Sequence, residues 1–352
     1  MAIDENKLND LIGRFVTDFG AAMHAATVVI GDKLGLYAAL AERGPITGSD
    51  LAQALNYDPR LVEEWLAAQY VSGYAEYDPI DATFWLTEEQ AAVLADASTP
   101  AFLVGAQTIT AAVWKDEERI RTAFRTGRGL GWHEHSHDLF HGTEKLFKPG
   151  YLANLVSAWI PALHGVDAKL RSGAKIADVG CGHGSSTILL ANEYPNAEII
   201  GFDYHAESIE VARKRAADAG IADRVTFEVA TAQDFPGSGY DLVCIFDALH
   251  DMGDPVGGAA HIRASLADDG TWLLVEPMAI AGLENNVNPV SRIFYAGSVG
   301  ICTPAAQAQS GGYALGNQVS DEQWSELLGD AGFTRFRRAT DTPFNRVFEV
   351  RP

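Results

Sequence analysis

The sequence has few cysteines, no long hydrophobic run and little positive charge. Its three cysteines are odd in number and far apart, which excludes a disulfide framework and a zinc site built on closely spaced cysteines. No stretch approaches the about 18 apolar residues that a membrane-spanning helix needs, and the N-terminus lacks a signal-peptide pattern. These absences are typical of a protein of a reducing compartment, and we expect a cytoplasmic protein.

The charge balance is strongly acidic. Lys and Arg number 26 against 47 Asp and Glu, so the formal net charge is −21. Because an acidic surface repels phosphate backbones and anionic membranes, neither nucleic acid nor membrane is expected as a general partner. Hydrophobic residues make up 47% of the chain, enough for a sizeable core. At 352 residues the chain exceeds an ordinary domain of about 100–200 residues, so two domains are expected.

Residues 1–100 have the pattern of a winged-helix domain. Residues 10–40 are rich in small apolar side chains and predict one or two helices buried on nearly all faces, which need a partner. Two short helices follow, the first capped by Ser49 and the second by Asp58, with Pro59 in its first turn. An aromatic-rich hairpin and a further helix are predicted to complete the domain.

Short apolar runs alternate with helix-length stretches after residue 174. This alternation is typical of an α/β domain, here residues 171–352, in which helices cover both faces of a parallel sheet. Two further apolar runs near the C-terminus predict a closing antiparallel pair. Residues 279–319 are too many for a plain loop, so we expect a lid-like insertion with its own helix. Residues 101–170 are predicted to form a helical connector that lines the cleft between the domains.

A glycine-rich loop follows the first strand of the predicted sheet. Gly180, Gly182 and Gly184 let the backbone turn tightly and let a ligand approach closely. A dinucleotide-binding loop would need glycine at position 185, which is Ser185, so the spacing favours S-adenosylmethionine over NAD. S-adenosylmethionine has no pyrophosphate, so the loop packs against its amino-acid and ribose parts instead. Asp203 lies nineteen residues after Gly184, where a carboxylate can accept both ribose hydroxyls.

With these motifs, residues 174–352 resemble the class I S-adenosylmethionine-dependent methyltransferases. Together with the winged-helix region, nearly the whole chain is similar to the two-domain small-molecule O-methyltransferases of plants and of bacterial secondary metabolism, closest to an actinobacterial subgroup. The resemblance implies a Rossmann-like sheet of seven strands with the last antiparallel, and S-adenosyl-L-methionine as cofactor. It also implies a homodimer formed by the N-terminal domain, which roofs the pocket of a small-molecule acceptor.

The candidate general base is His250, just past the carboxyl end of the fourth predicted strand. Methyl transfer to a hydroxyl needs a base whose pKa is near neutrality. The H-D-x-x-D sequence that starts at His250 resembles the catalytic histidine motif of the family, and Glu276 matches the acid that orients this histidine. On the residues alone, His250 could instead cap a helix, and Glu276 could be a solvated carboxylate.

Three positions depart from the family pattern. Thr231 follows the third strand, where many members carry Gly-Asp to hold the adenine. Phe246 replaces the lysine that plant members place before the histidine, and Gln318 stands where their second acid falls. These departures weaken the case for phenol methylation in particular. The predicted cofactor-binding residues are Asp178, Gly180, Cys181, Gly182, Gly184, Asp203, Tyr204, Ala232, Gln233, Phe246 and Asp247.

A histidine-rich segment contains His133, His135, His137 and His141. Metal binding, a pocket-lining role and plain solvation all remain open for it. Because no cysteine lies nearby and methyltransferases of this kind generally need no metal, we expect none. The predicted substrate-pocket residues are Trp132, His133, Trp159, Met278, Phe294 and Tyr295.

The sequence thus predicts a methyltransferase that acts on a hydroxyl of an aromatic or polyketide-like metabolite. One alternative is an N- or C-methyltransferase in which His250 only positions the acceptor. Another is a ligand-sensing regulator that binds DNA through the winged helix. Residues 1–100 carry five Lys and Arg against sixteen Asp and Glu, a balance of −11, which opposes DNA binding.

Overall fold

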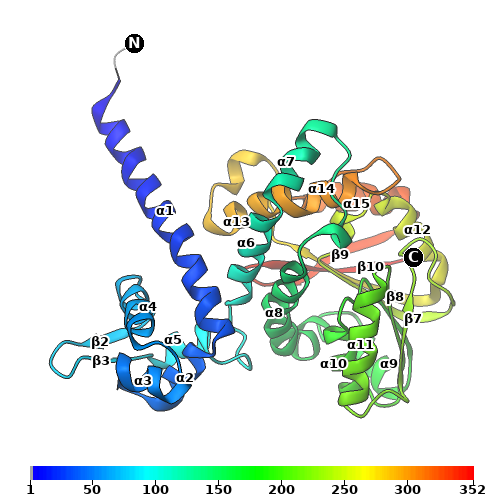
Figure 1. Ribbon diagram of the computed structural model, residues 1–352. Coiled ribbons are helices and arrows are strands. Elements are labelled where there is room, and N and C mark those ends of the chain that lie inside the picture. Colours follow the sequence, from blue (N-terminus) through cyan, green and yellow to red (C-terminus); the bar gives the residue numbers. More distant parts are fainter. Residues whose placement is uncertain (1–2) are drawn as a thin grey trace. The chain divides into compact units, whose positions relative to one another are not determined.

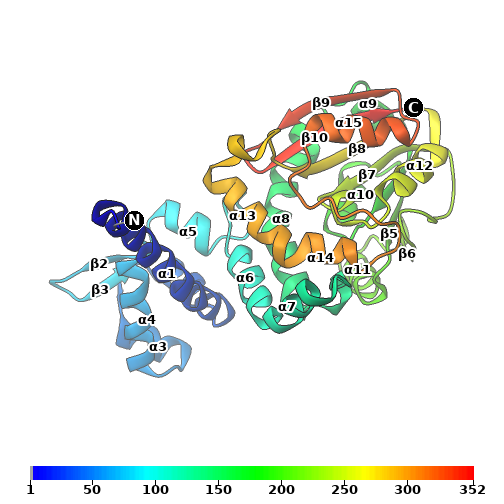
Figure 2. The same ribbon diagram turned by 90° about the horizontal axis from the view of Figure 1, so that it is seen from above.

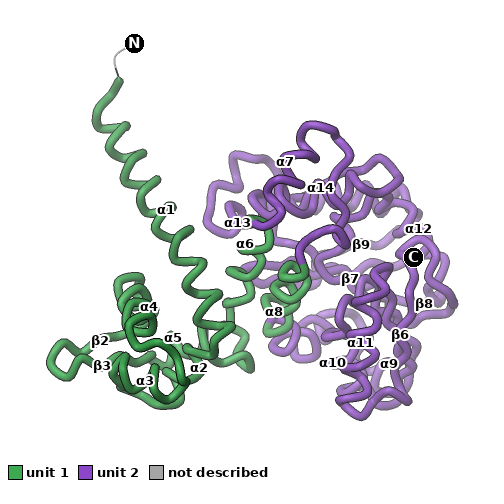
Figure 3. The backbone as a smooth tube through the Cα atoms, in the orientation of Figure 1, with its two compact units in different colours: residues 1–114, 137–149 green, residues 115–136, 150–352 purple. Residues whose placement is uncertain are grey.

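The computed structural model describes residues 3–352 and divides into two compact units (Figures 1 and 3). The first unit comprises residues 1–114 and 137–149, and the second comprises residues 115–136 and 150–352. The helical segment 101–170 is therefore divided between the two units. Among the described residues, no helix is both long and apolar enough to span a bilayer.

Helices and one small sheet make up the first unit. The sheet has three antiparallel strands in the order β1-β3-β2. The strands are β1 (Ile46–Thr47), β2 (Glu76–Asp78) and β3 (Thr83–Trp85), and the helices are α1 (Glu5–Lys33), α2 (Leu36–Arg43), α3 (Gly48–Leu55), α4 (Pro59–Val71), α5 (Glu88–Leu94), α6 (Gly105–Lys115) and the first part of α8 (His137–Asn154).

The caps of α3 and α4 test the helix starts expected from the sequence. Asp58 caps α4 through the Leu61 N–H, and Pro59 occupies the first turn, as predicted. The cap predicted for α3 at Ser49 is wrong. Thr47 is the N-cap, since its backbone is extended and its hydroxyl accepts from Asp50 N at 3.1 Å. Threonine and serine both cap well, so composition alone does not separate two candidates two residues apart.

The long helix α1 exposes most of its apolar side chains within this chain, in contrast to the burial expected on nearly all faces. Only Ala25, Val28 and Gly31, near its C-terminal end, are buried. Gly31 lies so close to Trp65 that an added Cβ would stand 2.4 Å from the indole ring. The exposed apolar side chains of the N-terminal half are Leu8, Leu11, Ile12, Phe15, Val16, Phe19 and Met23.

A seven-stranded sheet forms the centre of the second unit, in the order β6-β5-β4-β7-β8-β10-β9. The pairs among β4 to β8 are parallel, whereas β10 is antiparallel to both of its neighbours. The predicted seven-stranded sheet with its last strand antiparallel is confirmed. The strands are β4 (Lys175–Val179), β5 (Glu198–Asp203), β6 (Val225–Val229), β7 (Tyr240–Phe246), β8 (Leu266–Pro277), β9 (Arg335–Asp341) and β10 (Asn345–Arg351).

Alternate residues of each central strand enter two separate cores, one on each face of the sheet. Ile176 of β4 belongs to the core under α9 (Val166–Ser172), α10 (Ser185–Glu193) and α11 (Ala206–Asp218). Its neighbour Ala177 belongs to the core under α12 (Pro255–Ser265) and α15 (Asp321–Asp330). This arrangement leaves the carboxyl ends of the strands free to hold functional groups.

The segment 279–319 carries its own helices, as predicted. Figure 2 shows α13 (Pro289–Gly297) and α14 (Thr303–Gln307) following one another, with a π-helical turn, Ser298–Cys302, between them. The loop after α7 (Glu117–Thr126) lies against this segment, because Leu130 N donates to Pro304 O at 2.9 Å. Gly129 beside it has φ 71°, and an added Cβ would lie 2.3 Å from Pro304 O.

Candidate active site

The glycine-rich loop between β4 and α10 adopts a conformation that glycine favours. Gly180, Gly182 and Gly184 have φ of 75°, 52° and 79°. A Cβ at Gly184 would lie 2.8 Å from the Phe227 ring, whereas a Cβ at Gly182 would meet nothing within 4 Å. Packing therefore requires glycine at 184, while 182 leaves an open side where a ligand can approach the backbone.

Asp178, at the end of β4, holds the start of α10. Its Oδ2 accepts from the hydroxyls of Ser186 and Thr187, each at 2.6 Å. Burial raises the pKa of Asp178 to about 6; the two hydroxyl hydrogen bonds oppose this shift, and the charge of Asp203 adds to it. Its other oxygen, Oδ1, is buried without a hydrogen-bond partner among the described residues. Asp178 thus supports the loop and still has an acceptor to offer.

Asp203 ends β5 and ties the loop to the neighbouring strand. Its Oδ2 accepts from Gly182 N at 2.9 Å, and its Oδ1 accepts from His205 N at 2.8 Å. Burial raises its pKa, while these backbone donors act in the opposite direction. Since each carboxylate oxygen can accept two hydrogen bonds, the ribose hydroxyls of a nucleoside still find acceptors here.

Asp247 follows β7 with a left-handed backbone, φ 50°. Its Oδ1 accepts from Asn345 Nδ2 at 2.7 Å, and its buried Oδ2 has no partner among the described residues. Burial and the nearby Glu276 raise the pKa of Asp247 well above its usual range. The unpartnered oxygens of Asp178 and Asp247 lie at the ends of adjacent strands and suit a cationic donor such as the ammonium group of S-adenosylmethionine.

Four other predicted cofactor residues have side chains that contact the protein itself. Cys181 and Phe246 are part of the core, and Ala232 is buried against α12. Gln233 Nε2 donates to Asp254 O at 3.1 Å. A cofactor role for these four side chains stays a prediction.

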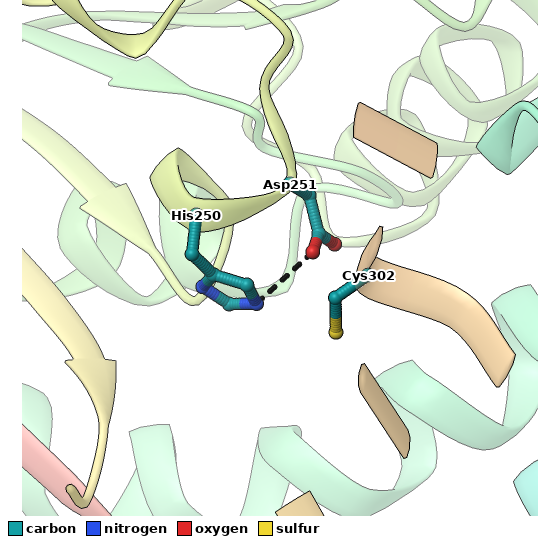
Figure 4. A group of neighbouring side chains, drawn as sticks. All are labelled: His250, Asp251 and Cys302. Carbon is teal, nitrogen blue, oxygen red and sulfur yellow. Dashed lines mark ion pairs between the residues drawn. The ribbon is translucent and has the colours of Figure 1, made fainter. Parts of the chain in front are cut away.

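His250 lies in the single turn Leu249–Asp251 after β7 and is 3% exposed (Figure 4). Its Nδ1 lies 2.6 Å from Oε2 of Glu276, near the end of β8. Glu276 is itself buried, and its Oε1 accepts from Leu249 N at 3.1 Å. Glu276, which the sequence analysis paired with His250, therefore contacts the imidazole ring, and the backbone of the turn Leu249–Asp251 holds it in place.

A second carboxylate faces the other ring nitrogen, and sequence reasoning missed it. Oδ1 of Asp251 lies 3.1 Å from Nε2 of His250. Burial lowers the pKa of His250, but Asp251 and Glu276 together outweigh this and raise it well above its ordinary value. Gln318, where a second acid was sought, instead donates to Met278 O at 3.1 Å. The only sequence signal for Asp251 was its place next to His250 in the H-D-x-x-D motif.

Cys302 completes the group drawn in Figure 4. One ligand atom from each of His250, Asp251 and Cys302 lies within 4.8 Å of the others. Burial and the charge of Asp251 raise the pKa of the Cys302 thiol to about 12. Asn317 Nδ2 donates to its Sγ at 3.4 Å. Nothing in the local sequence pointed to Cys302.

The predicted substrate-pocket residues lie in the second unit and differ in burial. Trp159 is buried in the core and stacks on Phe246 at 6.2 Å between ring centroids. His133 is exposed and meets the ring of Tyr204 edge to face at 6.1 Å, next to Asp203. The partly buried members are Trp132, Met278, Phe294 and Tyr295. Their contact with an acceptor stays a prediction.

Three histidines of residues 133–141, namely His133, His135 and His137, have different neighbours. His135 is buried, with Nδ1 3.0 Å from Asp116 Oδ2, and burial lowers its pKa despite that carboxylate. His137 packs beside Phe140 at 6.3 Å. Within residues 3–352, the grouping of His250, Asp251 and Cys302 is the one set of three candidate metal ligands that lie close together.

Two family profiles match separate parts of the chain. Residues 170–312 match the family described as a methyltransferase domain, and residues 22–96 match the family described as an Rv2258c-like winged HTH domain. Over 134 residues the chain is 34% identical to the 27-O-demethylrifamycin SV methyltransferase of Amycolatopsis mediterranei. The matched segment covers 35% of this chain and 47% of that protein. The chain spans between about a quarter and a half of the length of the curated relatives it matches.

Solved structures match nearly the whole chain. A putative O-methyltransferase of Nostoc punctiforme superposes with a TM-score of 0.72 at 20% identity, covering 96% of this chain and 98% of that one. Human N-acetylserotonin methyltransferase, solved in complex with S-adenosylmethionine, gives a TM-score of 0.72 at 16% identity, covering 100% and 99%. At these identities the likeness establishes the fold.

These matches define a winged-helix domain joined to a methyltransferase domain. Residues 170–312 thus form a methyltransferase domain, and nearly the whole chain has the fold of the solved two-domain O-methyltransferases, a class whose cofactor is S-adenosylmethionine. The resemblance predicted from the sequence is confirmed at this level.

Proposed function

We propose that the protein transfers a methyl group from S-adenosylmethionine to a hydroxyl of a small aromatic or polyketide-like molecule, with His250 as general base. The observation that carries this proposal is the buried contact of 2.6 Å between His250 Nδ1 and Glu276 Oε2. It fixes the imidazole by Nδ1, so that proton transfer falls to Nε2, which faces Asp251 in this structure. The match to the 27-O-demethylrifamycin SV methyltransferase, whose name specifies methylation at an oxygen of a small molecule, supports a hydroxyl acceptor.

The residues that hold the cofactor in this proposal surround the glycine loop. Asp203 accepts the ribose hydroxyls, and the open face of Gly182 lets the ligand approach the backbone. The unpartnered oxygens of Asp178 and Asp247 accept from the ammonium group. When bound, S-adenosylmethionine supplies a methyl group on a positively charged sulfur, which keeps the electron pair of the broken bond.

His250 then accepts the proton of the acceptor hydroxyl at Nε2 as the oxygen attacks the methyl carbon. Glu276 stabilises the imidazolium that forms, because its carboxylate stays at Nδ1. The negative charges of Glu276 and Asp251 raise the pKa of His250 well above its ordinary value, so Nε2 accepts the hydroxyl proton only after the proton it already carries has left to solvent. Asp251 stands at Nε2 in this structure, so the acceptor hydroxyl has to take its place there.

The test is His250→Ala in an assay with methyl-labelled S-adenosylmethionine and a panel of phenolic and polyketide hydroxyl acceptors. We expect turnover to fall at least about a hundredfold while cofactor affinity, measured by calorimetry, stays near wild type. Retained turnover with an amine or carbon acceptor would replace this proposal by N- or C-methylation, in which His250 only positions the acceptor.

The exposed apolar stripe on α1 supports a homodimer as part of the same proposal. Leu8, Phe15 and Phe19 recur at the spacing that brings side chains to one face of a helix, and all are exposed. A contiguous exposed apolar surface of this kind marks an interaction site, because soluble proteins rarely expose large apolar patches. A second copy of α1 offers the same stripe and would cover it.

A further inference from the structure

Three different metal-ligand types meet beside the candidate base. A ring nitrogen of His250, a carboxylate oxygen of Asp251 and the Sγ of Cys302 all lie within 4.8 Å of one another (Figure 4), and the nitrogen that faces Asp251 is Nε2. They come from two segments far apart in sequence, the turn Leu249–Asp251 and the π-helical turn Ser298–Cys302. His250 and Cys302 are buried; the Asp251 side chain is 21% exposed, although its Oδ1, which faces His250, is buried.

The surroundings of these ligands resemble the outer shell of a metal site. A metal-bound histidine usually donates its second ring N–H to a carboxylate, which fixes the ring. Glu276 occupies that position at Nδ1 of His250, at 2.6 Å. Asn317 Nδ2 donates to the Cys302 sulfur at 3.4 Å, as hydrogen-bond donors do around metal-bound thiolates.

We propose that His250, Asp251 and Cys302 bind one Zn²⁺ ion and that this ion blocks the base. One sulfur, one imidazole nitrogen and one carboxylate oxygen suit the tetrahedral preference of zinc, with water in the fourth position. Magnesium and calcium are disfavoured, because both prefer sites made of oxygen ligands. The Cys302 thiol and Nε2 of His250 each lose a proton to solvent when the metal binds.

Zinc occupancy and base catalysis exclude each other. The nitrogen that holds the metal is Nε2 of His250, the same atom that receives the hydroxyl proton in the proposed reaction. An ion at this position therefore inhibits methyl transfer, and a chelator restores it. This consequence depends on the proposed function, whereas the binding of zinc does not.

The binding test uses the full chain after treatment with a chelator, titrated with Co²⁺ as a spectroscopic probe and then with Zn²⁺. We expect one ion per chain and a thiolate-to-cobalt charge-transfer band that Zn²⁺ removes. Cys302→Ala abolishes the band and weakens zinc binding at least about tenfold. Cys244→Ala is the matched control, because Cys244 is also a buried free cysteine but lies in β7 outside the group. Asp251→Asn provides a second variant should Cys302→Ala fold poorly.

The activity arm compares the same proteins with added Zn²⁺. Wild type and Cys244→Ala are inhibited by stoichiometric zinc and recover with a chelator, while Cys302→Ala tolerates at least about tenfold more zinc. Absence of the thiolate band, or equal zinc affinity in wild type and Cys302→Ala, would overturn the inference. Zinc binding that depends on Cys302, in a protein without methyl transfer to any acceptor, supports the metal site and contradicts the proposed function instead.

Discussion

The Nδ1 of His250 lies 2.6 Å from Oε2 of Glu276, so that the ends of the adjacent strands β7 and β8 are joined at one imidazole. Both side chains are almost fully buried. A buried carboxylate and a buried imidazole each cost free energy unless they are paired. The pair therefore holds the candidate base in one orientation and fixes which nitrogen faces the acceptor.

Replacing Glu276 by glutamine tests this orienting role. The amide oxygen still reaches Nδ1, but the negative charge that stabilises the imidazolium is gone. We expect kcat to fall at least about tenfold while the dissociation constant of S-adenosylmethionine stays unchanged. Steady-state kinetics and calorimetry measure the two quantities. A parallel loss of cofactor binding would mean that Glu276 supports the whole site and does not act through His250.

Removing the Asp203 carboxylate should weaken the binding of S-adenosylmethionine. Asp203→Ala deletes the acceptor for Gly182 N and for His205 N as well as the predicted ribose contact. Charge-assisted hydrogen bonds contribute about 1.5–3 kcal/mol each, so affinity for S-adenosylmethionine should fall at least about tenfold. Calorimetric titration with S-adenosylmethionine, and separately with NAD, measures the change. Asp218→Ala, an exposed acid at the end of α11, is the control that should bind as wild type does.

Alanine at two glycines of the loop separates packing from ligand access. Gly184→Ala combines a left-handed backbone with a clash against Phe227, so it should lower the free energy of unfolding by at least about 2 kcal/mol. Gly182→Ala meets open space and carries only the backbone cost of about 1 kcal/mol. Urea unfolding compares the two. Gly182→Ala should nonetheless weaken the binding of S-adenosylmethionine, because the alanine side chain would occupy the open side of the loop.

Asp178 should make the stability depend on pH. Its pKa in the folded protein is about 6, above the 3.8 of a free side chain, so the folded state binds more protons between these values. The free energy of unfolding therefore falls as pH rises from about 4 to 6, by up to about 3 kcal/mol from this group. In Asp178→Asn this contribution is absent, and urea unfolding at several pH values measures the difference. Asp218→Asn should keep the wild-type dependence, and identical profiles for wild type and Asp178→Asn would contradict the assignment.

A charge in the apolar stripe of α1 should disrupt the proposed homodimer. Phe15→Glu places a carboxylate among exposed apolar side chains that a second copy would bury. We expect wild type to sediment as a dimer and this variant as a monomer. Ala21→Glu adds the same charge at an exposed position that the helical repeat places away from the stripe, so it should remain dimeric. A monomeric wild type would contradict the proposal.

Local patterns in the sequence predicted most of the second unit. Strand periodicity, the glycine spacing and the strand-end acids each depend on neighbouring residues, and all are where they were expected. The residues of the candidate site were harder to predict from the sequence. Cys302 reaches His250 only because the π-helical turn packs beside the turn after β7, and no local pattern records a contact across about fifty residues. The cap of α3 was predicted at Ser49 but is Thr47, because both residue types cap well and residue type alone does not locate the cap.

The sequence also could not predict the exposure of the N-terminal half of α1. Its composition predicted burial, and the single chain does not supply it. Periodicity reports that a helix face is apolar, but it does not say whether the covering surface belongs to the same chain. The sequence predicts a partner for this helix, and a covering partner stays a prediction that the exposed apolar side chains support.

Gly129 limits how the neighbouring insertion can change shape. No side chain fits at this position, because the carbonyl of Pro304 already occupies the space. The hydrogen bond from Leu130 to the same carbonyl fastens residues 303–308 to the loop after α7. If the insertion acts as the predicted lid, we expect it to open upstream, within residues 279–297. Insertions and deletions that alter acceptor choice should accordingly be tolerated in that upstream part and rejected around α14.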